Sequence, residues 1–263
     1  MRVLIKAGGI LLDEPGSRNA IARQLAAVAC EHELVVVHGG GKQVTRFLEE
    51  RGIQSRFSGG LRVSDAAVID AVTKVIAGTV NKQFVAAIIA AGQSAVGLSG
   101  VDGSLTKASA LRPELGFVGK PEHSDGHLLD LLVNAGYVPV VACIAGDREG
   151  NIYNVNADQM AVSCAAGWRA EKLIFLTDVS GVKNARGEVL PQLAPAEMRS
   201  LIDSGVAHGG MQAKLEASAS ALDAGLHEVI IAPGQDPDIC ARILRGEAVG
   251  TRFAVATREA GVL

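Results

Sequence analysis

Hydrophobic residues in this chain fall into two kinds of segment that alternate along its length. Short runs of branched apolar residues, typical of strands buried on both faces of a parallel sheet, lie at residues 2–6, 34–37, 94–98, 137–144, 172–177 and 228–232. Between them lie segments with apolar residues every three or four positions, which predict amphipathic helices. The alternation predicts an α/β fold with a mainly parallel sheet covered by helices on both faces.

Glycine, proline and capping residues set the expected bounds of the other elements. We expect helices at residues 17–31, 41–51, 64–91 with a bend near Gly78, 127–135 and 156–166, from Pro195, after Gly209-Gly210, and from Asp236 to near Gly246. Ser64 is the expected N-cap of the long helix. Residues 54–63 predict a hairpin, residues 105–122 short strands over one end of the sheet, residues 151–159 a polar insertion, and Arg252–Ala256 a last strand.

Composition excludes several classes of function. The chain has 263 residues, a net charge of −3 and only 3% aromatic residues, so neither the basic surface nor the stacking platform of a nucleic-acid-binding protein is expected. The longest uncharged run, Gln83–Val101, is interrupted by glycines and predicts a helix end and a strand rather than a membrane span. The four cysteines are far apart in apolar surroundings, so we expect buried free thiols and a cytoplasmic protein.

Three glycine clusters lie at predicted ends of strands or helices: Gly8-Gly9, Gly39-Gly40-Gly41 and Gly209-Gly210. The second follows a buried strand and opens a helix, which places free backbone N–H groups against an anion. Gly41-Lys42 lacks the other residues of a Walker A loop, and no G-x-G-x-x-G follows the first strand, which disfavours P-loop enzymes and Rossmann dehydrogenases. One cluster alone is more often a tight turn, but three together favour a polyanion site.

Two lysines and one aspartate are candidates for the chemistry of such a site. Lys6 ends the first strand, and Lys214 is expected in the first turn of its helix. Each could be an ordinary solvated lysine, but beside an anion both would neutralise charge, as phosphoryl transfer requires. Asp158 follows Asn156, a good N-cap, so helix capping alone explains both residues.

Arg62 and His38 each allow two interpretations. An arginine in a hairpin is usually solvated, but near an anion Arg62 could clamp a carboxylate through two hydrogen bonds. His38 could be catalytic, although a histidine at a strand end is more often a hydrogen-bonding spacer. Residues 154–159 carry more hydrogen-bonding groups than helix capping needs.

The candidate residues and the segments around them resemble the motifs of the amino-acid kinase family. The resemblance lies in Lys6-Ala7-Gly8-Gly9, His38-Gly39-Gly40-Gly41, Gly60-Leu61-Arg62-Val63, Gly78–Lys82, Asn154–Gln159, Thr177–Gly181, Gly209-Gly210-Met211 with Lys214, and Gly250-Thr251. Gly-Leu-Arg-Val and Asn-Val-Asn-Ala-Asp-Gln resemble the branch that acts on N-acetylglutamate. The motifs follow the family's order and cover nearly the whole chain.

The resemblance implies a three-layer α-β-α sandwich with an open, mainly parallel eight-stranded sheet, similar to carbamate kinase. Residues 1–263 would form one domain, with residues 1–168 binding the acyl acceptor and residues 169–263 binding ATP. The implied reaction transfers the γ-phosphoryl group of ATP to the side-chain carboxylate of N-acetyl-L-glutamate, in arginine biosynthesis. No protein nucleophile or general base is required, because the acceptor carboxylate is already ionised.

The same resemblance implies a role for each candidate residue. Lys6 and Lys214 would neutralise charge on the transferring group, and Asp158 would hold the two lysines in place. The acceptor would be bound by Gly40, Gly41, Arg62 on its α-carboxylate, Asn154 near its acetylated amino group, and Asn156. The phosphoryl groups and nucleotide would contact Gly8, Gly9, Asp178, Val179, Ser180, Gly181, Lys183, Val206, His208 and Gly210. Mg²⁺ would be held mainly by the ATP phosphates, so no protein ligand for a metal is expected.

Departures from the family pattern leave alternatives open. Ala7 replaces a bulkier apolar residue, and Gln212-Ala213 replace an Ile-Pro pair, so Lys214 is expected to be held less rigidly. One alternative is a sister kinase acting on aminoadipate bound to a carrier protein, on carbamate or on uridylate. The others are a catalytically inactive nucleotide or amino-acid sensor and an oxidoreductase. The acetylglutamate motifs disfavour a sister kinase. The presence of Lys6, Asp158 and Lys214 disfavours an inactive sensor, and the missing dinucleotide fingerprint disfavours an oxidoreductase.

Arginine-inhibited members of the family carry a helix before the first strand, whereas here the strand is expected to begin at Arg2. We therefore predict a homodimer rather than a hexamer, with the long helix from Asp65 as its interface by family analogy, and no feedback inhibition by arginine. Activity assays with millimolar arginine and sedimentation of the purified protein test this. Loss of activity or a hexameric mass contradicts it.

Overall fold

The computed structural model describes residues 1–254. An eight-stranded sheet forms its centre, in the order β12, β14, β13, β11, β1, β2, β8, β5. In that order the strands comprise Gln192–Leu193, Thr251–Ala254, Glu228–Pro233, Lys172–Thr177, Arg2–Ala7, Glu33–His38, Val138–Ala142 and Ala95–Ser99. Only the β13–β14 pair is antiparallel among these strands, so the predicted mainly parallel sheet is confirmed. Residues 255 and 256 of the expected last strand lie outside the described residues.

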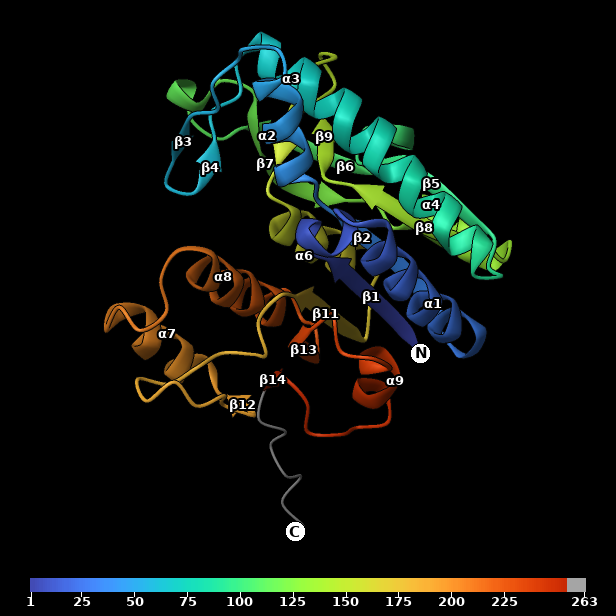
Figure 1. Cartoon of the computed structure of the whole chain (residues 1–263), viewed down its shortest axis with the longest axis vertical. Helices are drawn as coiled ribbons and strands as arrows, with labels where there is room; N and C mark the ends of the chain where they lie inside the picture. Colours follow the sequence, from blue (N-terminus) through green and yellow to red (C-terminus); the bar gives the residue numbers. More distant parts are fainter. Residues whose placement is uncertain (255–263) are drawn as a thin grey trace.

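Helices cover both faces of this sheet. On one face lie α1 (Pro15–Glu31), α4 (Asn81–Ala90) and α9 (Ile239–Leu244); on the other lie α5 (His127–Asn134), α6 (Ala157–Gly167) and α8 (Gly209–Asp223), with α7 (Pro195–Asp203) against α8. Figure 1 shows the N-terminal elements in the upper part of the molecule and the orange and red C-terminal elements in the lower part. The three-layer sandwich is confirmed.

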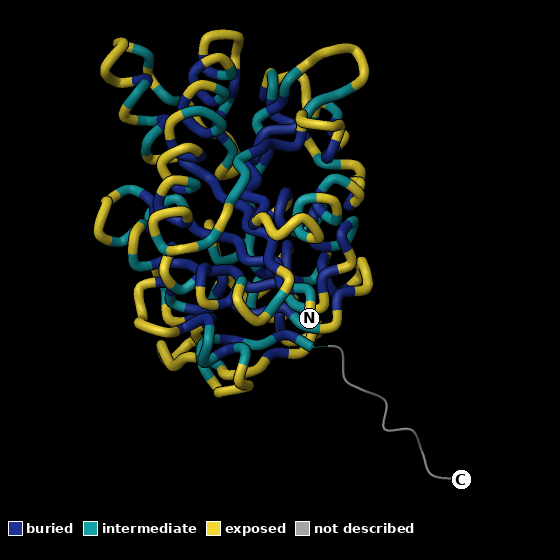
Figure 2. Tube along the Cα trace, turned by 90° about the vertical axis from the view of Figure 1, so that its right-hand side faces the viewer, coloured by how far each residue is buried: buried dark blue, intermediate teal, exposed yellow. Residues whose placement is uncertain are grey.

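The central strands are buried on both faces, as their composition predicts. Val35, Val36 and Val37 of β2 are fully buried, as are Leu173–Leu176 of β11. In Figure 2 the dark blue, buried segments run through the middle of the molecule and the yellow, exposed segments lie at its periphery. Branched residues pack well in such strands because the rigid side chains fill space on each face with little loss of rotamer freedom.

The long helix forms as predicted, with two differences. It consists of α3 (Ala66–Val72), a π-helical segment η2 (Thr73–Val80) and α4, so the expected bend is a stretch of wider turns. Its N-cap is Asp65, whose side chain accepts a hydrogen bond from Val68 N, and not Ser64. By length and composition Ala66–Ala90 could cross a membrane, but a core helix of a soluble protein can be equally long and apolar. Here 44% of the most apolar window of the helix is buried inside the protein.

The short strands predicted at residues 105–122 are present, but the barrel that they complete with two later strands was not predicted from the sequence. β6 (Thr106–Ala110), β7 (Val118–Ser124), β9 (Ile144–Gly146) and β10 (Ile152–Val155) close into a four-stranded barrel. The expected polar insertion at residues 151–159 therefore begins with a strand. Such short strands carry little periodic signal, and their pairing is set by partners far away in the sequence. The predicted hairpin is confirmed as β3 (Phe57–Ser58) and β4 (Leu61–Arg62).

The cysteines are all free, but not all buried. Cys30, at the end of α1, is exposed, which corrects the prediction for that residue. Burial raises the pKa of Cys143 and of Cys240 to about 12 and that of Cys164 to about 11, so these three stay as thiols at neutral pH.

A buried polar network holds the end of β2. Nδ1 of His38 lies 2.9 Å from the Gly39 carbonyl and must donate to it, so Nε2 accepts from Asn81 Nδ2 at 3.0 Å. Asn81 also donates to the Val140 carbonyl at 2.8 Å, and its oxygen accepts from Lys82 Nζ at 3.0 Å. The prediction that His38 is a hydrogen-bonding spacer is confirmed. Burial lowers the pKa of His38 to about 4, so the ring is neutral at pH 7.

The low pKa of His38 predicts a pH-dependent stability. Because the unfolded chain takes up this proton first, the contribution is complete above pH 6.5 and is lost as the pH falls toward 4. The free energy of unfolding should decrease by about 3 kcal/mol over that window from this group alone. Urea unfolding of the wild type and of His38→Gln at several pH values measures the difference. His227→Gln, which changes an exposed histidine, should keep the wild-type slope; equal slopes in all three proteins contradict the prediction.

Candidate functional site

The candidate site lies at the carboxyl ends of three neighbouring parallel strands. Gly8-Gly9 follow β1, Gly39–Gly41 follow β2, and Asp178 follows β11. The Gly8 amide donates to the Leu176 carbonyl of β11 at 2.9 Å, which ties the first turn to the neighbouring strand. Ligands of open α/β sheets bind at this edge, because the loops that leave adjacent strands converge there.

The two glycine turns approach each other closely. A Cβ atom on Gly9 would lie 3.3 Å from the Gly40 nitrogen and 3.5 Å from the Gly41 nitrogen. A Cβ on Gly40 would lie 3.3 Å from both Ile76 and Val80 of the π-helical segment. A side chain would therefore be crowded at both positions, by backbone at Gly9 and by two apolar side chains at Gly40. The facing turns and the N-terminus of α2 (Gly41–Glu49) present free N–H groups, the environment that an anionic oxygen prefers.

Lys6, Asp158 and Lys214 form a buried ion triad. Lys6 Nζ lies 2.7 Å from Asp158 Oδ1, as an ion pair rather than an aligned hydrogen bond, and Lys214 Nζ donates to Oδ2 at 3.3 Å. Burial by itself raises the pKa of Asp158, but the charges of the two lysines outweigh it, so the pKa is lowered and the carboxylate stays ionised. The predicted convergence of these three residues is thus present.

Local structure explains how Asp158 and Lys214 reach this point. Asn156 caps α6, and its side-chain oxygen accepts from Asp158 N at 2.9 Å and Gln159 N at 3.2 Å, as predicted. Helix α8 begins at Gly209 itself, with φ of +54°, so Lys214 lies in the second turn and not in the first. The expected unfavourable interaction of Lys214 with the helix dipole is therefore weak, since that effect falls off within the first turn.

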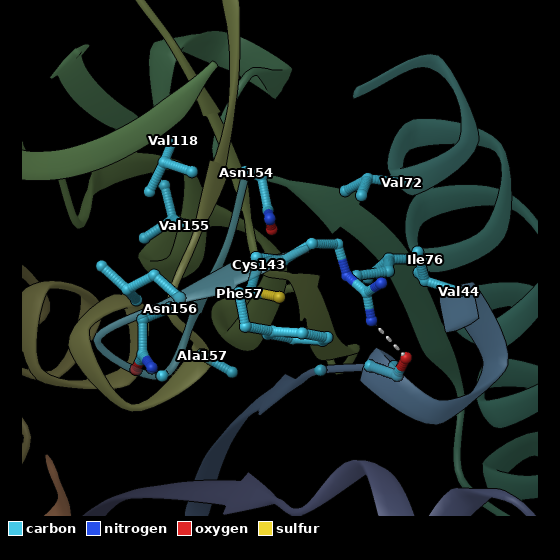
Figure 3. A pocket seen from close by; sticks show the side chains of 16 residues that line it. Val44, Phe57, Val72, Ile76, Val118, Cys143, Asn154, Val155, Asn156 and Ala157 are labelled. Atoms are coloured by element: carbon cyan, nitrogen blue, oxygen red, sulfur yellow. Dashed lines mark hydrogen bonds between the residues drawn. The ribbon is translucent and has the colours of Figure 1, made fainter. Parts of the chain in front are cut away.

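Beside the triad lies a cavity of about 180 Å³ that contains the predicted acceptor residues. Its lining comprises Gly39, Gly40, Gly41, Val44, Phe57, Gly60, Leu61, Arg62, Val72, Ile76, Val118, Cys143, Asn154, Val155, Asn156 and Ala157. In Figure 3, Phe57, Asn154 and Ile76 extend into it from the hairpin, the barrel and the long helix. Asn154 is anchored by a 3.1 Å bond to Ser64 Oγ. The mixture of apolar walls and a few polar groups suits a small polar acid.

Arg62 is the cation of this cavity. Its side chain is 8% exposed and donates to the Gly41 carbonyl at 2.9 Å, drawn as the dashed line in Figure 3, and to Thr45 Oγ1 at 2.7 Å. It also donates to Ser55 Oγ and lies 4.8 Å from the centre of the Phe57 ring. Burial lowers the pKa of Arg62 from its usual value. An orientation fixed by several partners prepares the guanidinium to bind a carboxylate.

A second cavity, of about 1170 Å³, adjoins the first and shares Gly60, Leu61 and Asn156 with it. Asp158, Lys214, Gly209 and Gly210 also line it, between the hairpin, β7, α6 and α8. Two members of the triad, Asp158 and Lys214, therefore line the large cavity beside the small one, a suitable position for transfer of a group from a large ligand to a small one. Lys6 lines neither cavity and is paired with Asp158 from behind that wall.

The remaining nucleotide-side candidates lie on two loops. Asp178, Val179, Ser180, Gly181 and Lys183 follow β11, whereas Val206 and His208 precede α8. A Cβ on Gly181, whose φ is +146°, would lie 2.7 Å from Thr251 Oγ1, and that oxygen accepts from Val182 N at 2.8 Å. None of these seven candidates lines either cavity described above, so their roles stay predictions.

Some residues that shape the site were not identified from the sequence. Thr45 and Ser55 hold Arg62, Asn81 supports the turn after β2, and Gln43 reaches the other glycine turn. Only Asn81 lies in a motif that the resemblance uses. The others are polar residues whose partners are distant in sequence, so no local pattern distinguishes them from solvated residues.

Comparison with known proteins supports the family resemblance. The model of the "Amino acid kinase family" matches residues 1–233. An acetylglutamate kinase of Solibacter usitatus is 56% identical over 97% of this chain and all of its own length, and one of Acidobacterium capsulatum is 43% identical over 95% and 99%.

Solved structures share the fold at lower identity. N-acetylglutamate synthase of Neisseria gonorrhoeae has a TM-score of 0.86 at 24% identity over 97% of this chain, but this chain spans only 59% of the synthase chain. Carbamate kinase of Giardia lamblia has a TM-score of 0.73 at 16% identity over 96% and 97% of the two chains. The family match, the identities and the shared fold lead to one conclusion: this chain belongs to the amino acid kinase family.

Proposed function

We propose that this chain transfers the γ-phosphoryl group of ATP to the side-chain carboxylate of N-acetyl-L-glutamate, a step of arginine biosynthesis. The observation that carries the proposal is the ion triad of Lys6, Asp158 and Lys214, two of whose members, Asp158 and Lys214, line a large cavity that adjoins a small one. The 56% identity with an acetylglutamate kinase over the full length of that relative supports the same activity.

The small cavity suits the acceptor. Arg62 offers a fixed cation for the α-carboxylate, Asn154 offers an amide for the acetylated nitrogen, and the apolar wall of Val72 and Ile76 suits a methyl group. With the α-carboxylate at Arg62, the side-chain carboxylate can point toward Gly40 and Gly41, which line the same cavity. A substrate bound in this way is held in line for attack.

The reaction needs charge neutralisation more than acid–base chemistry. An oxygen of the ionised acceptor carboxylate attacks the γ-phosphorus, the bond to the β,γ-bridging oxygen breaks, and ADP and an acyl phosphate form. Lys6 and Lys214 neutralise charge on the transferring group and the leaving oxygen, and Asp158 keeps both lysines charged and in place. Gly9, Gly40 and Gly41 offer N–H groups to the phosphoryl oxygens, whereas the Gly8 N–H is already used on the Leu176 carbonyl.

ATP and magnesium belong to the same proposal. ATP would occupy the side of the large cavity near Gly209 and Gly210. It would extend from there to the loops around Asp178 and His208, which do not line that cavity. As the family resemblance implies, Mg²⁺ would be held chiefly by the ATP phosphates and would supply further charge neutralisation. We further propose a homodimer in the cytoplasm, where free cysteines are usual.

The activity can be tested with a trap for acyl phosphates. The protein is incubated with Mg-ATP, hydroxylamine and one candidate acceptor: N-acetyl-L-glutamate, aminoadipate on its carrier protein, carbamate or uridylate; ADP release is followed in parallel for the last two. We expect hydroxamate with N-acetyl-L-glutamate and turnover near background with the others. Absence of hydroxamate with N-acetyl-L-glutamate would refute the proposed function, and turnover with another acceptor would identify a sister kinase.

The triad lysines should act on the transition state more than on binding. Lys6→Ala and Lys214→Ala should each lower kcat by about 10²–10³-fold, because one preorganised charge is lost, while KM for either substrate changes only a few-fold. Steady-state kinetics and thermal unfolding of each variant measure this. Lys74→Ala, at an exposed lysine of the long helix, is the control and should retain activity. A loss confined to KM contradicts a role in the transition state.

A further inference from the structure

Gln43 of α2 lies between the two glycine turns, yet the proposed reaction leaves it without a role. Its Nε2 donates to the Gly9 carbonyl at 3.3 Å. Its Oε1 lies 3.8 Å from the position that a Cβ on Gly40 would occupy. One side chain therefore contacts the turn after β1 and approaches the turn after β2.

The Oε1 atom of Gln43 is buried and has no hydrogen-bond donor among residues 1–254. The orientation of the amide follows from its other end, because the Gly9 carbonyl can only accept and so must face Nε2. Buried polar atoms without a partner are uncommon in native proteins. This one is retained directly beside the closest approach of two functional turns.

Gln43 has a fixed position relative to the Gly40-Gly41 turn, and its side chain is hydrogen-bonded to the Gly8-Gly9 turn. Val44 N donates to the Gly40 carbonyl at 3.0 Å, which fixes the first turn of α2 on the glycine that precedes it. The bond from Gln43 then fixes Gly9 relative to Gly40. Phosphoryl transfer depends on placing the attacking and phosphoryl oxygens to within a fraction of an ångström. A small change in the distance between Gly9 and Gly40 would therefore lower the rate of transfer.

We propose that Gln43 is a positioning residue that holds the Gly8-Gly9 turn at a fixed distance from the Gly40-Gly41 turn. The expected effect of Gln43 on kcat rests on the proposed function, whereas its effect on the stability of the Gly8-Gly9 turn does not. Gln43 touches neither reacting atom; it acts through the backbone of Gly9. The separation it sets decides whether the N–H groups of both turns can reach one phosphoryl group.

Two variants of Gln43 test the kinetic part. Gln43→Met keeps the length of the side chain without its donor, and we expect kcat to fall about tenfold with KM for both substrates nearly unchanged. Gln43→Glu also repels the Gly9 carbonyl and places a negative charge beside the anion site, so kcat should fall about a hundredfold. Gln24→Met is the matched control: Gln24 Nε2 donates to the Asp236 carbonyl, also at 3.3 Å, between α1 and the segment before α9. It should retain wild-type kcat.

Hydrogen exchange without substrates tests the structural part. Amides of residues 8–12 should exchange about fivefold faster in Gln43→Met than in the wild type, and at the wild-type rate in Gln24→Met. Unchanged exchange, or faster exchange with unchanged kcat, overturns the proposal. If the wild type forms no product from N-acetyl-L-glutamate, the proposed function fails separately, and exchange alone decides whether Gln43 couples the turns.

Discussion

The buried ion triad is the interaction on which the arrangement of the site depends. Lys6 belongs to β1, Asp158 to α6 and Lys214 to α8, so one carboxylate joins the central sheet to two helices. Lys6 and Asp158 are each less than one-tenth exposed. A charge buried to this degree is strongly unfavourable without a partner, so loss of Asp158 would leave two cations without a counter-ion, whereas loss of one lysine leaves the other paired with Asp158. The same constraint holds two cations ready beside an anion site.

Close packing around the glycine turns is the second constraint. A methyl group on Gly9 would crowd the Gly40 backbone, and one on Gly40 would crowd the side chains of Ile76 and Val80. The neutral ring of His38 donates to the Gly39 carbonyl and accepts from Asn81, which supports the turn after β2. The Gln43 side chain connects the helix that follows this turn to Gly9. These contacts involve uncharged groups, so they position the N–H donors without competing with the lysines for the anion.

The fold separates the shared chemistry from the recognition of the acceptor. The triad and the glycine turns lie on the sheet and the helices that flank it. The small cavity, in contrast, is closed by the hairpin, the long helix and the four-stranded barrel, all of which lie between β2 and α6. Changes in these segments can alter which acid fits beside Arg62 while the ends of β1 and β2 stay the same.

The sequence by itself determined the alternation of strands and helices, the glycine turns and the candidate charged residues, because buried strands, caps and tight turns have local composition signals. Lys6, Asp158 and Lys214 could each be identified as candidates. Only the tertiary structure brought them within ion-pair distance, buried Arg62 among Gly41, Thr45 and Phe57, and closed β6, β7, β9 and β10 into a barrel. The same applies to the turn of α8 that holds Lys214 and to the exposure of Cys30. These features depend on contacts between residues far apart in sequence, and such contacts are decided by packing rather than by any local pattern.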